Sequence, residues 1–522
     1  MSDPFYITTA ISYPNGPPHI GHAYEAIAAD TIARFQRARG RDVRFQTGTD
    51  EHGLKMAQAA RGEGVEPRAF ADKMSRLFQE MCDTLDVSYD RFIRTSDEDH
   101  YRASQAIWTA MQQRGDLYLG RYEGWYSVRD EAYYEESELV EGEGGAKLSP
   151  QGTPVEWTVE ESWFFRLSAY QDKLLALYAE NPEFIRPESR RNEVVRFVEG
   201  GLSDLSISRT SFSWGVPVPD SPGHVMYVWL DALTNYLTGL GYPDDTELWR
   251  KYWPADIHLI GKDVVRFHAV YWPAFLMSAG IALPKQVYGH GFLLSRGEKM
   301  SKSVGNVVDP MALAQRFGVD ALRYFLLREV TFGQDGSYSA EAIANRANAE
   351  LANSFGNLAQ RTLTQIVRNC GGGLPQIHGH NDADNALFEI VCGAAADTIP
   401  AAFDSLALSR ACETWIHAVF ACNAYIDEQA PWTLRKTDPK RMETVLATLY
   451  ICIAVLAVAI RPVIPGSADK LLDAMGVQPE LRTYEAILSH WYSPLAESDF
   501  RLEQPTPLFP RIELAEDEKT GT

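Results

Sequence analysis

Two polar segments that begin 280 positions apart, at His19 and Lys299, constrain the fold of this chain more than any other feature of its sequence. His19-Ile20-Gly21-His22 follows Phe5–Ser12, an aromatic and β-branched run that predicts a strand and ends at a proline-rich turn. Lys299-Met300-Ser301-Lys302-Ser303 follows a second predicted strand, Gln286–Leu294. Both segments can belong to one site only if the two strands lie in one parallel sheet and end at the same edge.

The pattern around both segments predicts the α/β class, with a doubly wound parallel sheet of the Rossmann type. A helix is expected from His19 to Arg39, because Ala23, Ile27 and Ala33 share one face and Gly40 can end it. The other expected elements of the sheet region are strands Val43–Gln46, Ile257–Ile260 and Gln286–Leu294 and helix Val264–Ala279. Right-handed crossovers would join these elements into one parallel sheet.

The chain divides by composition into five segments. The two halves of the Rossmann domain are expected at residues 1–114 and 206–295, and an acidic, aromatic insertion at residues 115–205 separates them. The lysine segment lies in a connecting region at 296–340, and residues 341–522 predict an all-α bundle of amphipathic helices.

Charge and cysteine content narrow the class of protein. The net charge of −21 does not favour nucleic acid, although a local patch at Arg186–Arg196 could hold a phosphate backbone or could equally be a solvated helix face. The six cysteines form no C-x-x-C pair and predict buried thiols in a reducing compartment. No targeting segment is recognisable at the start, and the apolar stretches are short or interrupted, so we expect a cytoplasmic protein outside the membrane.

The two polar segments suggest an ATP site that is closed from two sides. A helix N-terminus attracts phosphate, His19 and His22 lie on one helical face, and Gly21 leaves room for a flat adenine. Lys299 and Lys302 lie in a loop that could close over a triphosphate. For the histidine segment alone, simple helix capping explains the residues equally well.

Together the segments resemble the HIGH and KMSKS signatures of class I aminoacyl-tRNA synthetases, and further residues narrow the resemblance to the methionyl-tRNA synthetase family. The resemblance covers Phe5 to about Pro465. It implies catalytic roles for His19, His22, Lys299 and Lys302, and ATP contacts from His19, Gly21, His22, Gly261, Asp263, Lys299, Ser301 and Lys302. It also implies that ATP binds with Mg²⁺ and that methionine is activated as an adenylate before its transfer to tRNA.

The resemblance also implies a methionine pocket. Asp50 matches the carboxylate that binds the α-ammonium group, which agrees with the need of a desolvated cation for an anionic partner. Helix capping by Asp50 and core packing of any single aromatic side chain remain open. The full set implied is Ala10, Ile11, Tyr13, Asp50, Trp229, Ala232, Leu233, Tyr236, Phe267 and His268.

The helical region resembles the anticodon-binding bundle of this family. Asn353, Asn357 and Arg361 are spaced four apart and would line one helix face, and Trp432 matches an aromatic residue on which an anticodon base stacks. The implied partners are L-methionine, ATP and the initiator and elongator tRNAs for methionine. We expect a monomer.

The insertion departs from the family pattern. Trp125–Glu138 resembles a zinc knuckle whose ligands are replaced, and the chain has no cysteine between Cys82 and Cys370. We therefore expect no structural zinc or other resident metal, and packed aromatic side chains in its place.

Three other functions remain compatible with the sequence. One is a class I synthetase for another apolar amino acid, and another is a tRNA-binding paralogue that has lost activation. The third is a simple HIGH-type nucleotidyltransferase, which leaves the long helical region without a purpose.

Overall fold

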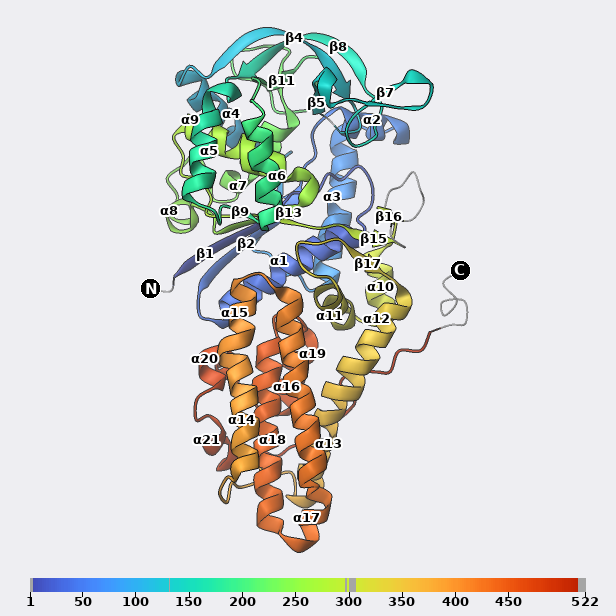
Figure 1. The fold of residues 1–522 in the computed structure, drawn as a ribbon, viewed down its shortest axis with the longest axis vertical. Helices are drawn as coiled ribbons and strands as arrows, with labels where there is room; N and C mark the ends of the chain where they lie inside the picture. Colours follow the sequence, from blue (N-terminus) through green and yellow to red (C-terminus); the bar gives the residue numbers. More distant parts are fainter. Residues whose placement is uncertain (1–2, 131, 296–297, 300–306, 515–522) are drawn as a thin grey trace.

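The chain folds into an α/β part and a helical part that are stacked along the long axis of the molecule (Figure 1). This structure, a computed structural model, describes residues 3–130, 132–295, 298–299 and 307–514.

A six-stranded parallel sheet forms the centre of the α/β part and confirms the predicted fold class. Its strand order is β3-β2-β1-β13-β14-β9. The strands are β1 (Pro4–Thr9), β2 (Asp42–Thr49), β3 (Arg91–Arg94), β9 (Ile185–Arg186), β13 (Ile257–Gly261) and β14 (Val287–His290). β1 pairs with both β2 and β13, so the strand order reverses at β1 and opens a crevice at its carboxyl end.

Helices cover both faces of this sheet. Helix α1 begins after His19 and is almost completely buried, because its small residues let it pack closely against β1 and β2. Gly40 follows α1 with a φ of 80°, a conformation that glycine adopts at little cost. The helices of this part are α1 (Ile20–Ala38), α2 (Leu54–Glu63), α3 (Pro67–Thr84), α4 (Glu98–Gln113), α5 (Gln171–Glu180), α6 (Glu188–Glu199), α7 (Val228–Thr238), α8 (Glu247–Tyr252) and α9 (Trp272–Ala279).

The inserted segment arches over the open end of the α/β part (Figure 1). Its main feature is a long antiparallel pair, β4 (Leu117–Ser127) and β8 (Glu156–Phe165). Its shorter strands are β5 (Ala132–Tyr134), β6 (Val140–Glu141) and β7 (Lys147–Leu148). Three more short strands lie at its end or after it, β10 (Leu205–Ser206), β11 (Ser208–Arg209) and β12 (Val225–Met226). β9 lies within residues 115–205 and joins the central sheet, so that segment is only partly separate from the sheet.

Two elements that were expected to be regular are interrupted at the crevice. The expected helix Val264–Ala279 divides into a π-helical segment, Phe267–Tyr271, and helix α9. Pro273 lies at this junction and has no N–H with which to complete an α-helical turn. The expected strand Gln286–Leu294 divides into β14 and β15 (Leu293–Ser295). Gly291 lies between them, where a Cβ atom would come within 2.2 Å of the Gln334 backbone.

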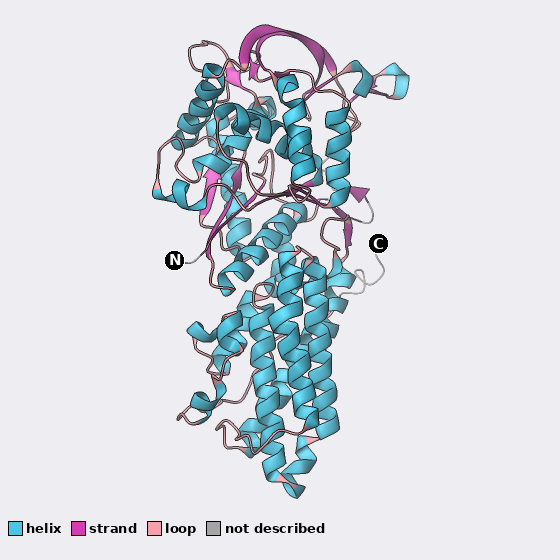
Figure 2. Cartoon of the chain, turned by 60° about the vertical axis from the view of Figure 1, so that its left-hand side comes forward, coloured by secondary structure: helices cyan, strands magenta, loops and turns pink. Residues whose placement is uncertain are grey.

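The helical part consists of long helices that run roughly parallel to one another (Figure 2). A connecting region precedes it, with α10 (Pro310–Phe317), α11 (Val319–Glu329) and the strands β16 (Glu298–Lys299) and β17 (Gly336–Tyr338) beside β15. The bundle contains α12 (Ala340–Arg346), a π-helical segment (Ala347–Gly356), α13 (Asn357–Asn369), α14 (Asp382–Gly393), α15 (Ile399–Asp404), α16 (Leu408–Gln429), α17 (Pro431–Thr437), α18 (Pro439–Ile460), α19 (Pro465–Ala474), α20 (Tyr484–Ile487) and α21 (Tyr492–Ala496).

Two helical stretches of the bundle are long and apolar enough to cross a membrane by length and composition alone. They are Asp382–Asp404 and Pro439–Ile460. In the second, 89% of the most apolar 18-residue part is buried inside the protein, as in the central helix of a bundle. The apolar surface of α18 is therefore explained by packing against its neighbouring helices.

A buried ion pair joins the two parts. Asp30, in the middle of α1, accepts a 2.6 Å hydrogen bond from Arg323 of α11, and neither side chain is exposed. Arg323 also donates to the carbonyl groups of Val463 and Pro462 in the bundle and of Leu85 after α3. Burial alone would raise the pKa of Asp30, but the positive charges of Arg323 and Arg34 outweigh burial and lower it.

Replacing Arg323 by methionine is expected to lower the free energy of unfolding by about 3–5 kcal/mol, because a buried carboxylate loses its main partner. Denaturant unfolding measures this change. Arg39→Met is the control, since Arg39 pairs with Asp404 at the surface and an exposed pair contributes about 1 kcal/mol or less. Equal losses for the two variants would contradict a joining role for Asp30 and Arg323.

Candidate active site

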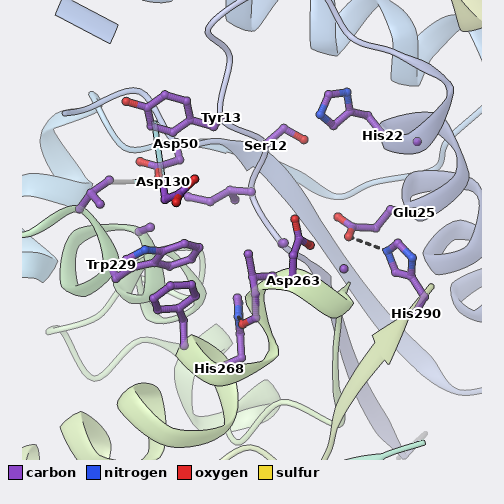
Figure 3. A pocket seen from close by; sticks show the side chains of 18 of the residues that line it. Ser12, Tyr13, His22, Glu25, Asp50, Asp130, Trp229, Asp263, His268 and His290 are labelled. Atoms are coloured by element: carbon purple, nitrogen blue, oxygen red, sulfur yellow. Dashed lines mark hydrogen bonds and ion pairs between the residues drawn. The ribbon is translucent and has the colours of Figure 1, made fainter. Parts of the chain in front are cut away.

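One cavity of about 440 Å³ lies at the carboxyl edge of the central sheet, where the strand order reverses. Its walls come from the loop after β1, the first turn of α1, the turn after β2, helix α7 and the segments that follow β13 and β14 (Figure 3). It brings together Ala10, Ile11, Tyr13, His19, Gly21, His22, Asp50, Trp229, Ala232, Leu233, Tyr236, Gly261, Asp263, Phe267 and His268, all of them predicted site residues.

The lysine segment is described only at its start. Lys299 lies in β16, which pairs antiparallel with β15, and Leu293 at the start of β15 lines the cavity. Ser301 and Lys302 lie outside the described residues. Their roles therefore remain predictions.

The histidine segment caps helix α1. His19 is the N-cap residue, and its Nδ1 accepts the N–H of Gly21 at 3.1 Å, while Nδ1 of His22 accepts the N–H of His19 at 3.1 Å. The two rings stack with centroids 3.8 Å apart. Because each Nδ1 is an acceptor, each neutral ring carries its proton on Nε2. Capping therefore prepares both rings to donate from Nε2, and the two interpretations of this segment are compatible.

A buried acid–base pair borders the same end of the cavity and was missed from the sequence. His290 Nε2 bonds to Glu25 Oε2 at 2.9 Å, with 7% and 14% of the two side chains exposed (Figure 3). Burial raises the pKa of Glu25, and its hydrogen bond to His290 only partly offsets that effect. Glu25 follows His22 by three positions, so the helical period could have placed it on the cavity face.

The opposite end of the cavity is aromatic. The rings of Trp229 and Phe267 stack with centroids 3.7 Å apart and planes 7° apart. His268 Nε2 lies 2.6 Å from the hydroxyl of Tyr236, and its Nδ1 lies 2.9 Å from the carbonyl of Val264. Burial raises the pKa of Tyr236 and lowers that of His268 to about 4, so the phenol donates to a neutral imidazole. This wall is uncharged at neutral pH, which suits an apolar side chain.

The inserted segment contributes Arg129, Asp130, Tyr134 and Gln151 to the cavity, and the sequence did not predict these contacts. Asp130 Oδ2 accepts hydrogen bonds from Ser149 at 2.6 Å, Thr153 at 2.5 Å and Tyr134 at 3.1 Å. These donors are hydroxyl groups and not the thiolates that zinc prefers. The turn that carries Arg129 is thus held by a carboxylate–hydroxyl cluster.

The predicted anticodon residues lie in the helical part, in the π-helical segment Ala347–Gly356, in α13 and in α17. Asn353 and Asn357 are exposed. Arg361 pairs with Asp427 at 2.7 Å, and its guanidinium group lies 5.5 Å from the centroid of the Trp432 ring, which is 42% exposed. An exposed tryptophan beside an arginine offers a stacking surface.

Comparison with known proteins agrees with this architecture. The family model described as tRNA synthetases class I (M) matches residues 5–363, and the model of the anticodon binding domain of methionyl tRNA ligase matches residues 375–520. The reversal in the sheet, the histidine-capped helix and the first match place the chain in class I of the tRNA synthetases.

Individual relatives are more specific. A methionine–tRNA ligase of Brucella suis is 58% identical over 514 residues, which cover 98% of this chain and 99% of that relative. A solved structure of Mycobacterium tuberculosis methionyl-tRNA synthetase in complex with methionyl-adenylate is 55% identical, with a TM-score of 0.94 over 98% of this chain and 100% of that chain. The apo form is 50% identical, with a TM-score of 0.87 over 99% of each chain. The chain belongs to the methionyl-tRNA synthetase family, as the sequence resemblance implied.

The low pKa of His268 predicts a pH-dependent stability. An unfolded histidine binds a proton near pH 6.5, whereas folded His268 stays neutral down to about pH 4. The stability that depends on neutral His268 is therefore present above pH 6.5 and is lost as the pH falls toward 4. Replacing His268 by asparagine should remove about 2 kcal/mol of the stability difference between pH 7 and pH 5. Denaturant unfolding at both pH values measures this difference.

The control variant for this prediction is His417→Asn, because His417 is exposed on α16. It should leave the pH dependence unchanged. An unaltered pH dependence in His268→Asn would show that the imidazole of His268 is not held neutral.

Proposed function

We propose that this chain activates L-methionine with ATP and transfers it to the tRNA for methionine. The carboxylate of methionine attacks the α-phosphorus of ATP, the bond to pyrophosphate breaks, and methionyl-adenylate forms. The 3′-terminal ribose of the tRNA then attacks the carbonyl carbon, and AMP leaves. Family membership supports this reaction, and so does the likeness to a relative that was solved in complex with methionyl-adenylate.

The observation that carries the proposal is that one cavity contains both a phosphate-binding helix end and an uncharged aromatic wall with a carboxylate beside it. Asp50, which is 6% exposed, would pair with the α-ammonium group, and Trp229 and Phe267 would contact the thioether. His19 and His22 would donate from Nε2 to ATP phosphates at the other end. A methionine held by Asp50 therefore presents its carboxylate toward the phosphate end.

Catalysis in this arrangement depends on alignment and on charge stabilisation. Holding the two reactants in place accounts for much of the rate, because the entropy cost of bringing them together is met when they bind and not in the reaction step. Lys299 and Lys302 would stabilise the negative charge that develops on the departing pyrophosphate. ATP would bind as its magnesium complex, which is a substrate.

The helical bundle would read the anticodon. Asn353, Asn357 and Arg361 would contact bases, and a base would stack on Trp432. Initiator and elongator tRNAs carry the same anticodon and would both be recognised there.

We further propose that the enzyme acts as a monomer in the cytoplasm and holds no structural zinc, since hydroxyl groups surround Asp130 where a knuckle would need thiolates.

Methionine-dependent exchange of pyrophosphate into ATP tests this function. Exchange should occur with methionine and be far weaker with leucine, isoleucine and valine, because only methionine has a flexible thioether that makes favourable contacts with aromatic rings. Charging of tRNA in the same preparation tests the second step. Exchange with another amino acid but not with methionine would contradict the proposal, and tRNA binding without any exchange would favour an inactive paralogue.

His19→Asn separates capping from catalysis. Asparagine is a good N-cap residue and can accept the N–H of Gly21, but it has no group at the position of Nε2. The melting temperature should stay near that of the wild type, while kcat for exchange falls about 10²–10³-fold, as when one preorganised donor is lost. His19→Ala should lose activity and also about 1 kcal/mol of stability. A wild-type rate for His19→Asn would show that His19 only caps the helix.

A further inference from the structure

A buried carboxylate behind the cavity bonds to two histidines. Asp231 lies in the first turns of α7 and has no exposed surface. Its Oδ2 lies 2.6 Å from Nδ1 of His52, and its Oδ1 lies 2.7 Å from Nε2 of His100. Both histidines are almost fully buried, at 1% and 0% exposure. Asp231 does not line the cavity, so it cannot contact a substrate there.

The outer nitrogens of the two imidazoles are also bonded. Nε2 of His52 lies 2.9 Å from the hydroxyl of Tyr101, and Nδ1 of His100 lies 2.9 Å from Oγ1 of Thr238. Burial raises the pKa of Tyr101 to about 12, so its phenol keeps a proton to donate. His52 therefore donates from Nδ1 to Asp231, and its orientation is fixed at both ring nitrogens.

The carboxylate is ionised in this network. Burial alone would raise the pKa of Asp231, but its electrostatic interactions and hydrogen bonds with the imidazoles of His52 and His100 lower it to about 2. Removing one of its two hydrogen-bond donors from a buried carboxylate costs free energy. The bonds to His52 and His100 therefore resist any movement of Asp231 away from either imidazole.

The network connects the two walls of the predicted methionine pocket. His52 lies two residues after Asp50, in the turn that follows β2, and Asp231 lies two residues after Trp229. The same turn is anchored by Tyr13, whose hydroxyl donates to the carbonyl of His52 at 2.9 Å. One carboxylate therefore links the turn that carries Asp50 to the helix that carries Trp229.

Helix α4 braces this link from behind. It supplies both His100, which bonds to Asp231, and Tyr101, which bonds to His52. The turn and helix α7 are thus each attached to α4 as well as to each other. The three bonds form a closed brace that sets the separation between the turn and α7.

We propose that the His52–Asp231–His100 network is a positioning device that sets the separation between the ammonium-binding carboxylate Asp50 and the thioether wall at Trp229. The proposal rests on the proposed function, because it assigns a consequence to methionine binding. A methionine is held at both ends, so a change in this separation weakens one contact when the other is made. The phosphate end of the cavity is formed by α1, whereas the bonds of the network join the turn after β2, α4 and α7. A disrupted network should therefore raise the KM for methionine and leave the KM for ATP unchanged.

Two variants of His100 isolate the bond to Asp231. Glutamine places its amide nitrogen near the position of Nε2 and can still donate to Asp231, whereas the shorter asparagine cannot reach it. In pyrophosphate exchange, His100→Asn should raise the KM for methionine about 10- to 100-fold, since displacement by about 1 Å can cost about 10²-fold. kcat at saturating methionine and the KM for ATP should stay near the wild-type values. His100→Gln should restore the KM for methionine.

Asp231→Asn and Asp384→Asn form the matched pair of controls. Asp384 is also a fully buried carboxylate bonded to two side chains, Arg441 and Tyr425, but it lies in the bundle. Both variants should lower the melting temperature, and only Asp231→Asn should raise the KM for methionine. If Asp231→Asn does not fold, the two His100 variants still decide the question.

The outcomes distinguish this inference from the proposed function. A KM for methionine that stays unchanged in His100→Asn would overturn the inference while wild-type exchange upholds the function. Equal rises in the KM for methionine and for ATP, or a rise that His100→Gln fails to reverse, would show a merely structural role and overturn it as well. Wild-type protein without methionine-dependent exchange would overturn the proposed function and this inference together.

Discussion

The geometry of this protein depends on helix α1, and the ion pair between Asp30 and Arg323 holds that helix in place. The N-terminus of α1 forms the phosphate end of the cavity, and its middle bonds to Arg323 at 2.6 Å. Arg323 in turn donates to the carbonyl of Val463 in the bundle. A buried arginine is tolerable only when its donors are satisfied, and here carbonyl groups from two parts of the chain satisfy them. Helix α1 and the bundle are therefore positioned by the same side chain.

The cavity has two ends with opposite electrostatic character, and the fold explains both. At one end, the positive end of the α1 dipole and the Nε2 protons of the two capping histidines favour anions. At the other end, Tyr236 and His268 are neutral, and the carboxylates of Asp50, Asp130 and Asp263 also line the cavity. A ligand that carries phosphate at one end and an ammonium group with an apolar chain at the other fits this gradient. An aminoacyl-adenylate of methionine has these features.

Local patterns predicted the parallel sheet and the strand–turn–helix at His19. The residues of the aromatic wall, Trp229, Ala232 and Tyr236, were predicted from the family resemblance and not from helical or strand periods. The interruptions were not predicted. The break at Gly291 is needed because the Gln334 backbone approaches from a distant part of the chain, and this approach has no local signal. Strand β9 joined the central sheet for the same reason, since its pairing with β14 spans about a hundred residues of sequence.

The buried polar networks were the least predictable features, although they determine how well the cavity is formed. Asp231, His100 and Arg323 carry no motif, because their role is defined only by partners that folding brings together. Burying such groups costs free energy unless every donor and acceptor is paired, so an apolar core would stabilise the fold at lower cost. A fully paired network tolerates fewer alternative arrangements than apolar packing does. In-line attack requires reacting atoms to be placed within a fraction of an ångström, and only the walls of the cavity can provide that placement. The polar networks behind both walls are the part of this fold that meets that requirement.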